Sequence, residues 1–207
     1  MAELRTERLL LRRWHESDLA PWAAMNADPL VRAYLGGVVP RAQAEASARR
    51  FDRELEERGW GWWAVEVRAT GEFIGFTGLD PVDEEMPFTG VEAGWRLARA
   101  AWGRGYATEA AVAVLDFGFR VLALPEILAV TAATNRRSQR VMRKLGMTRD
   151  PADDFDDPSM PPGPHRPGVV YRVKRSAFEA ARAAHAARAA HAVRATRATR
   201  ATRADGT

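Results

Sequence analysis

The 207-residue chain contains 31 basic and 27 acidic side chains, no cysteine and four histidines, at positions 15, 165, 185 and 191. This length favours one domain with its own core, the lack of cysteine excludes disulfides and thiolate catalysis, and the histidines lack metal-ligand spacing. No apolar run approaches the roughly 20 residues of a membrane span, and the opening MAELRTERLL lacks the apolar region of a signal peptide. We therefore expect a soluble cytoplasmic protein without a metal.

The net charge of +4 lies at the end of the chain. Six arginines between positions 177 and 207 are opposed only by Glu179 and Asp205, so residues 1–176 are neutral overall. From position 180 an Ala/Arg/His repeat and then an Ala-Thr-Arg repeat distribute arginine around every side of a helix. We expect a domain over residues 1–176 and a low-complexity tail over 177–207, frayed helix or disordered. A solvated extension is favoured over loose contact with nucleic acid.

The first part of the body is predicted to be mostly helical after one strand over Glu7–Trp14. The pattern ESDLAPWAAMNADPLVRAYL predicts a broken pair of helices, with Ser17 and Asp28 as caps. A further helix is predicted from Arg41 to the terminating Gly59.

After Gly59 the pattern changes to short apolar or alternating runs. Three consecutive antiparallel strands are predicted at 62–67, 72–79 and 90–97. The elements expected next are a helix from about residue 104 to 121, a strand at 126–132, a helix at 135–146 and a strand at 168–173. Residues 150–167 are too rich in Pro and Asp for regular structure. A meander leading into βαβ predicts an α/β sheet packed by helices.

The stretch AWGRGYATEA, residues 101–110, lies between a predicted strand and a predicted helix. Backbone N–H groups converge at a helix start, and glycine lets an anion approach them closely, so this position suits a phosphate. The stretch is no P-loop, because no Gly-Lys-Ser/Thr follows. It is no dinucleotide fingerprint either, because Thr108 stands where a third glycine is required.

Two motifs together point to a family. GWRLARAAWGRGYATEA (94–110) and NRRSQRVMRKLGM (135–147) resemble the acyl-CoA-binding motifs of the GNAT superfamily of N-acyltransferases, closest to the RimJ/RimL-type branch of ribosomal-protein alanine N-acetyltransferases. The likeness includes ERLLLRRWHESDL, GEFIGFTGL and HRPGVVYRV, and covers about residues 4–175. It implies the α/β (α+β) GNAT fold, a mixed, mostly antiparallel central sheet flanked by helices and splayed at its fourth and fifth strands, 91–97 and 126–132.

The resemblance implies that acetyl-CoA binds in the slot between these two strands. Pantetheine would pair with the backbone of Trp95, Arg96 and Leu97, and the pyrophosphate would lie on the amides of 101–107. The residues assigned to this turn are Arg99, Trp102, Gly103, Arg104, Gly105, Tyr106, Ala107 and Thr108. The residues assigned to the next helix are Asn135 and Ser138, toward pantetheine and thiol, and Arg140 or Arg143, toward the nucleotide. The family often has Gln or Arg where this chain has Ala100, so Arg99 is the candidate for that charge.

Acetyl transfer needs an amine held in line, removal of its proton and stabilisation of an oxyanion. Glu92 is the candidate base because it lies on the slot strand, where alternation puts it on one face with Gly94; the alternative is an ordinary exposed glutamate. Ser138 is the candidate proton donor to the departing thiolate, or a helix-start hydrogen bonder. Tyr171 is a candidate for either role from the last strand, or a core residue.

The acceptor is less well defined by the sequence. Acidic loops at 80–86 and 153–157 would flank the acceptor side and favour a cationic substrate, unless they are only solvated. Of Trp60, Trp62 and Trp63, two are expected in the core and the remaining one in a pocket, and His165 is expected in a loop or at a strand entry.

These observations predict an N-acetyltransferase that acts on a primary amine, either a protein N-terminal α-amine or a small molecule, by direct attack in a ternary complex. The alternatives are a non-catalytic acyl-CoA-binding module and a nucleic-acid-associated protein that uses the basic tail. We expect no membrane partner, and a monomer or homodimer.

Overall fold

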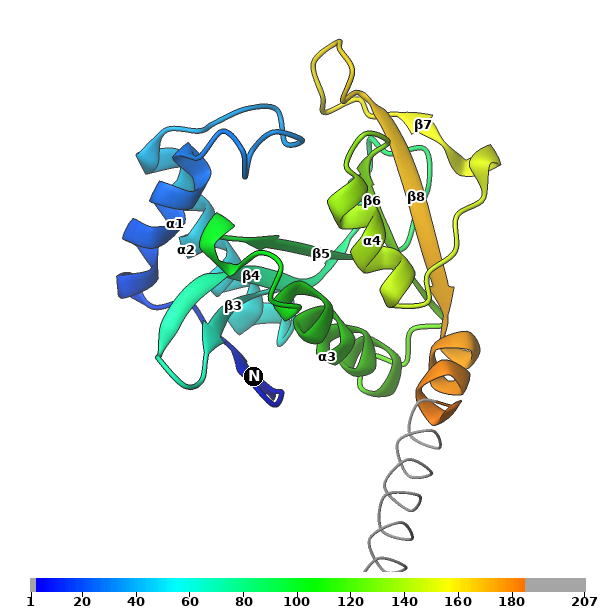
Figure 1. The fold of residues 1–207 in the computed structure, drawn as a ribbon, viewed down its shortest axis with the longest axis horizontal. Helices are drawn as coiled ribbons and strands as arrows, with labels where there is room; N and C mark the ends of the chain where they lie inside the picture. Colours follow the sequence, from blue (N-terminus) through cyan, green and yellow to red (C-terminus); the bar gives the residue numbers. More distant parts are fainter. Residues whose placement is uncertain (1–2, 185–207) are drawn as a thin grey trace, which may run out of the picture.

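A computed structural model describes residues 3–184 of the chain. One eight-stranded sheet runs through this part in the order β1-β2-β3-β4-β5-β6-β8-β7 (Figure 1). Its strands are β1 (Leu4–Arg5), β2 (Leu9–Arg12), β3 (Trp62–Val67), β4 (Glu72–Pro81), β5 (Val91–Leu97), β6 (Glu126–Ala132), β7 (Phe155–Asp156) and β8 (Pro167–Lys174). The flanking helices are α1 (Leu19–Ala27), α2 (Arg41–Arg58), α3 (Tyr106–Arg120) and α4 (Arg136–Lys144). The predicted mixed, mostly antiparallel sheet is confirmed.

Two adjacent tryptophans on β3 show how the sheet is covered on both faces. Successive side chains of a strand point to opposite faces. Trp62 packs against Phe51 of α2, with ring centroids 6.4 Å apart, whereas Trp63 packs against Phe117 of α3 at 5.3 Å. Helices α1 and α2 therefore cover one face and α3 the other. Both tryptophans are buried, as predicted for two of the three in this run.

The sheet opens between β5 and β6. Strand β5 pairs with β4 in antiparallel register along its whole length, from Val91 to Leu97. Its parallel pairing with β6 consists of one position, Glu92 opposite Leu128. Beyond that position the two strands run in clearly different directions (Figure 1). The predicted splay of these strands is confirmed, and it leaves one backbone edge of β5 without a strand beside it.

The predicted second helix before residue 40 was wrong. Helix α1 ends with Asp28 as its C-terminal cap, and residues 28–40 form turns. The Asp28 carboxylate accepts a hydrogen bond from the Leu30 amide at 2.9 Å, which stabilises a turn. Gly36 and Gly37, both with positive φ, and Pro40 then keep the chain out of the helix until α2 begins.

Residues 150–167 contain more regular structure than predicted. A 3₁₀ turn forms at Pro151–Asp153, and β7 pairs with β8 through Phe155 opposite Gly168. The absence of a side chain at Gly168 makes this pairing possible, because a Cβ there would lie 2.6 Å from the Phe155 ring.

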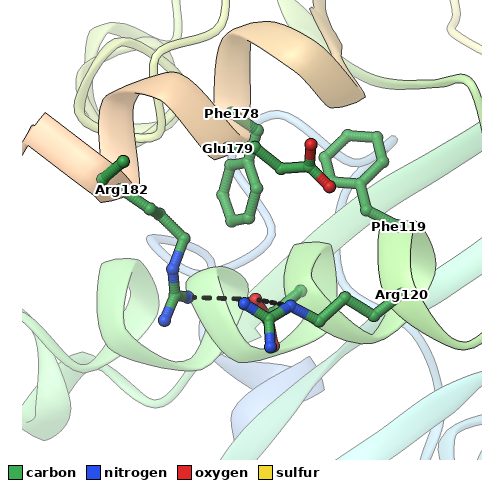
Figure 2. Close-up of a pocket in the computed structure, with 7 residues that line it drawn as sticks. Phe119, Arg120, Phe178, Glu179 and Arg182 are labelled. Atoms are coloured by element: carbon green, nitrogen blue, oxygen red, sulfur yellow. Dashed lines mark ion pairs between the residues drawn. The ribbon is translucent and has the colours of Figure 1, made fainter.

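The C-terminal segment is helical from residue 175 to 184 and packs on α3. Phe178 is buried in the core beside Phe119, with ring centroids 5.2 Å apart, and Arg182 pairs with Asp116 at 3.4 Å (Figure 2). The predicted domain boundary after residue 176 therefore divides this helix. The remainder of the predicted tail lies outside the described residues.

A buried ion pair near the start of the chain fixes β2 to the turn before α1. Arg12 and Asp18 are 5 % and 2 % exposed, and the guanidinium donates to both carboxylate oxygens, at 2.7 and 3.0 Å. Asp18 also accepts from the His15 amide at 2.8 Å, and Arg12 also donates to Glu66 at 2.7 Å. Removing the Asp18 charge would take one of its two carboxylate partners from the buried Arg12 guanidinium.

We expect Asp18→Asn to lower the free energy of unfolding by about 3–5 kcal/mol, because it breaks this buried pair. Glu3→Gln is the matched control: its partner Arg5 is exposed, so the loss should stay below about 1 kcal/mol. Urea denaturation followed by tryptophan fluorescence measures both. Equal losses in the two variants would contradict the assignment.

Candidate functional site

A cleft of about 1180 Å³ begins where β5 and β6 separate. Its walls come from the α1–α2 loop, α2, the end of β4 and the loop after it, β5, the start of α3, β6 and α4. A second pocket, of about 310 Å³, lies between α3 and the C-terminal helix (Figure 2). Two carboxylates, Asp116 and Glu179, line it, and Asp116 is already paired with Arg120 and Arg182. The large cleft is therefore the candidate site.

The turn before α3 presents unpaired backbone amides to this cleft. Gly103 and Gly105 have φ angles of 76° and 81°, a left-handed conformation that favours glycine. Gly105 is the N-terminal cap of α3 and supplies no side chain to it. The amides of Tyr106, Ala107 and Thr108 follow in the first turn, where no intrahelical acceptor exists. All but Arg104 of residues 101–108 line the cleft, so the turn is built to receive an anion.

Arg8, in the bend just before β2, holds this turn in place, a role that the sequence analysis missed. Its guanidinium donates to the carbonyl of Arg104 at 3.0 Å and to Glu109 at 2.6 Å, and it lies 4.7 Å from the centroid of the Tyr106 ring. Although burial opposes the shift, hydrogen bonds from Thr6 and Arg8 lower the pKa of Glu109. No local signal in the sequence links positions about 100 residues apart.

The edge of β5 forms the middle of the cleft wall. Trp95, Arg96 and Leu97 all line it. The Leu97 carbonyl accepts a hydrogen bond from Trp102 Nε1 at 2.8 Å, so this oxygen already has a partner. Trp102 in turn lies 4.5 Å beneath the guanidinium of Arg137. The indole thus connects β5, the turn and α4 across the cleft.

Helix α4 forms the opposite wall. Asn135 caps it by accepting from the Ser138 amide at 3.2 Å, and it donates to Thr131 at 2.9 Å. Both Asn135 and Ser138 also line the cleft. The hydrogen bond that caps the helix therefore does not remove either residue from the site.

The positive charge in the cleft comes partly from unexpected residues. Arg137, Arg140 and Lys144 line it, at a spacing of three and four residues that puts them on one face of α4. Arg143 falls on another face and does not line the cleft. Arg99 is also outside the lining and pairs with Asp28 at 3.4 Å. Helical spacing within NRRSQRVMRK was the signal that would have selected Arg137 and Lys144.

Glu92 lies in the cleft where the two strands still touch. It is partly buried, and burial together with the charges of Asp80, Asp83 and Asp157 raises its pKa to about 7. Asp80 stands opposite it on β4 and is itself held by Arg58 at 2.9 Å. A carboxylate with this pKa exchanges protons near neutral pH, which suits a general base.

The structure does not bring Tyr171 to the cleft. Its side chain is 5 % exposed in the core, and its hydroxyl lies 3.4 Å from Gln139 Oε1. Of the two possibilities given for Tyr171, a catalytic role or a place in the core, the structure shows the second.

The two predicted acidic loops meet at one end of the cleft. Asp83 and Glu84 line it, and Asp157 of the second loop is close enough to raise the pKa of Glu92. The loops contact each other through Phe88 and Phe155, with ring centroids 5.1 Å apart. The acidic character of this end is therefore a property of the folded site.

Across the cleft mouth the α1–α2 loop touches the loop before β8. The Tyr34 ring lies 4.9 Å from the His165 ring, edge to face, and His165 Nδ1 lies 2.8 Å from Thr134 Oγ1. His165 thus occupies a loop, as predicted, and joins the two sides of the opening. Tyr34 lines the cleft, whereas His165 does not.

Residues 3–184 hold neither a cluster of metal ligands nor a membrane-spanning helix. They contain no group of three or more His, Cys, Asp or Glu side chains arranged to hold a metal ion. In the same range, no helix has the length and apolar character needed to span a bilayer.

The comparisons with known proteins agree with this geometry. The model of the acetyltransferase (GNAT) domain matches residues 8–148. The protein YkkB of Bacillus subtilis is 35 % identical over 146 residues, which are 70 % of this chain and 84 % of YkkB. The chain therefore belongs to the GNAT family. It is an acyl-CoA-dependent acetyltransferase.

Solved structures show the same fold. An acetyltransferase from Agrobacterium tumefaciens superposes with a TM-score of 0.68 at 31 % identity, covering 84 % of this chain and 94 % of that one. The ribosomal-protein-S5-alanine acetyltransferase from Vibrio fischeri gives 0.68 at 15 % identity, covering 86 % and 99 %, a likeness of fold alone.

The glycine turn yields a paired prediction. Gly105→Ala should cost about 1–2 kcal/mol of stability, because its φ is left-handed, and should raise the KM for acetyl-CoA by about tenfold. Its new Cβ would lie 3.4 Å from Arg8 Nη2, in the turn where the phosphates are expected to bind.

Gly71→Ala is the matched control. Gly71 has a similar φ of 70° in the β3–β4 turn, outside the cleft lining, and open space around it. It should lose comparable stability with an unchanged KM. If folded Gly105→Ala has an unchanged KM for acetyl-CoA, the turn only redirects the chain and does not bind the cosubstrate.

Proposed function

We propose that the protein transfers acetyl from acetyl-CoA to a primary amine by direct attack within a ternary complex, with Glu92 as the base. The acceptor class we propose is a protein N-terminal α-amine or a small amine, within a RimJ/RimL-like branch of the family. One observation carries the proposal: a helix-start anion site and a carboxylate of raised pKa share one cleft along β5.

The cosubstrate fits the positive half of the cleft. The amides of residues 105–108 would receive the pyrophosphate, and Arg137, Arg140 and Lys144 would add cationic charge around the nucleotide. Pantetheine would follow the edge of β5 that has no strand beside it. This arrangement would direct the thioester toward Glu92.

The chemical step would need three groups from the chain. Glu92 takes a proton from the ammonium or the attacking amine, directly or through water, while the amine nitrogen forms a bond to the thioester carbon. A backbone amide of β5 stabilises the oxyanion of the tetrahedral intermediate. As the carbon–sulfur bond breaks, the Ser138 hydroxyl donates a proton to the thiolate and takes one from solvent water in the same step.

The acidic end of the cleft would attract the acceptor. Asp80, Asp83, Glu84 and Asp157 surround the entrance to Glu92 and favour a protonated amine. Three of them, Asp80, Asp83 and Asp157, raise the pKa of Glu92 and make it a stronger base, so binding and deprotonation of the amine are promoted together.

Glu92→Gln tests the base. We expect kcat/KM to fall about 10²–10⁴-fold at pH 8, because proton removal by a positioned carboxylate is lost. In the native enzyme kcat/KM should rise with pH through about 7, where Glu92 becomes the carboxylate, and this limb should vanish in the variant. Glu84→Gln, at an exposed cleft position, should retain the limb.

The same substitution has an opposite effect on stability. Because folding raises the pKa of Glu92, the native fold loses stability as pH rises from about 4.3 to about 7. Glu92→Gln should therefore be more stable than the native protein at pH 8, by on the order of 3 kcal/mol, and equal to it near pH 4. Thermal unfolding at both pH values measures this difference, and a destabilised variant at pH 8 would show that Glu92 is only structural.

The acceptor is identified by thiol release from acetyl-CoA with N-terminal peptides, polyamines and other small amines. Turnover with at least one amine is expected. Tight binding of acetyl-CoA with no turnover on any amine would instead indicate a non-catalytic acyl-CoA-binding module.

A further inference from the structure

Arg96 is an unusual charge in the cleft. Its Nη1 donates to the Asn26 side chain at 2.9 Å, and the guanidinium lies 5.2 Å from the Trp22 ring and 5.3 Å from the Phe76 ring. Its Nε is buried without any hydrogen-bond partner. Within residues 3–184, Arg96 forms no ion pair.

Such a cation is costly to bury, because its hydration is lost and no carboxylate replaces it. Burial, and secondarily the charge of Arg32, lowers the pKa of Arg96 to about 9, so it stays protonated at neutral pH. Burial also lowers the pKa of Arg32. Arg32 donates to the carbonyls of Gly37 and Leu35 and offers no anion. Two neighbouring guanidiniums thus share a site that lacks negative charge.

Arg96 faces the same side of β5 as Glu92. The two positions are four residues apart on one strand, so both side chains point to the face covered by α1 and α2. Their Cα atoms are on the order of 13 Å apart. Between them lies Gly94, where a Cβ would come within 2.8 Å of the Trp62 ring. An aromatic floor of Trp62 and Phe76 therefore separates the carboxylate from the guanidinium.

The side wall above this floor is also apolar. Leu30, Val31, Tyr34 and Leu35 of the α1–α2 loop line the cleft, and Leu30 is 52 % exposed. The cleft thus presents, in order, an acidic end, an apolar middle and an unpaired cation.

We propose that Arg96 binds an anionic group of the acceptor, so that the substrate is an amine joined through an apolar spacer to a carboxylate. The proposal rests on the acetyl transfer and on the role of Glu92 proposed above. The amine lies at Glu92, the spacer over Trp62 and Phe76, and the carboxylate at Arg96. The phosphates of acetyl-CoA have their own site at the amides of residues 105–108 and on α4, whereas Arg96 extends to the opposite side of β5.

The test compares ω-amino acids with their primary amides, from glycine through 4-aminobutyrate and 6-aminohexanoate to 8-aminooctanoate. Thiol release from acetyl-CoA is measured at pH 8 with the full chain. The longer acids should exceed their amides in kcat/KM by about tenfold or more, because a charged hydrogen bond is gained. Glycine, which is too short to span the two ends, should show no such preference.

Arg96→Met should reduce the acid-to-amide ratio to about one, and Arg96→Lys should retain part of the preference. The ratio compares two acceptors on one protein sample, so partial unfolding of a variant does not alter it. Equal rates for acids and amides in the native enzyme, or a preference that survives Arg96→Met, would overturn the proposal. A raised KM for acetyl-CoA with an unchanged ratio would assign Arg96 to the cosubstrate instead.

If peptides or polyamines are acetylated and none of the ω-amino acids is, the proposed acetyl transfer stands and the proposed anion site at Arg96 is wrong. If no amine reacts, the proposed function fails, and calorimetry decides the anion site separately. Hexanoate, but not hexanamide, should then bind the protein in the presence of CoA, with binding lost in Arg96→Met. Absence of hexanoate binding to the native protein would overturn the proposal.

Discussion

The site depends on the failure of two neighbouring strands to pair. Strands β5 and β6 meet at Glu92 and Leu128 and then separate. A parallel pair that continued would satisfy its backbone groups internally and close the sheet. Because it does not, one edge of β5 keeps N–H and C=O groups for a ligand, and the space beyond becomes the cleft. The helices α3 and α4 then place their N-terminal ends on its two sides.

The charges in this opening are arranged by sign. The start of α3 and the basic face of α4 form a positive half that suits phosphates. The loops after β4 and around β7 gather carboxylates beside Glu92, and their repulsion adds to burial in raising its pKa to about 7. One cleft can therefore hold a polyanionic cosubstrate and a cationic amine without either sign neutralising the other.

Much of the fold and part of the site were predictable from local patterns. The strands after Gly59 follow apolar alternation, and the helix starts at 106 and 136 follow the glycine turn and Asn135. The second helix before residue 40 was not formed, because Asp28, Pro29 and a glycine pair favour turns over propensity. Arg143 was a candidate by its place in the motif, and it does not line the cleft. Tyr171 was a candidate by its place on the last strand, and it packs in the core, which was the alternative.

The sequence by itself determined the order of the elements, the left-handed glycine turn at the start of α3 and the presence of Glu92 on the strand beside it. These features depend on residues close together in the chain, where backbone conformation and side-chain period are set. Only the tertiary structure decided the raised pKa of Glu92, the support of the turn by Arg8 and the unpaired state of Arg96. Each of these results from groups far apart in sequence, whose burial and mutual distance arise when the sheet and its helices pack.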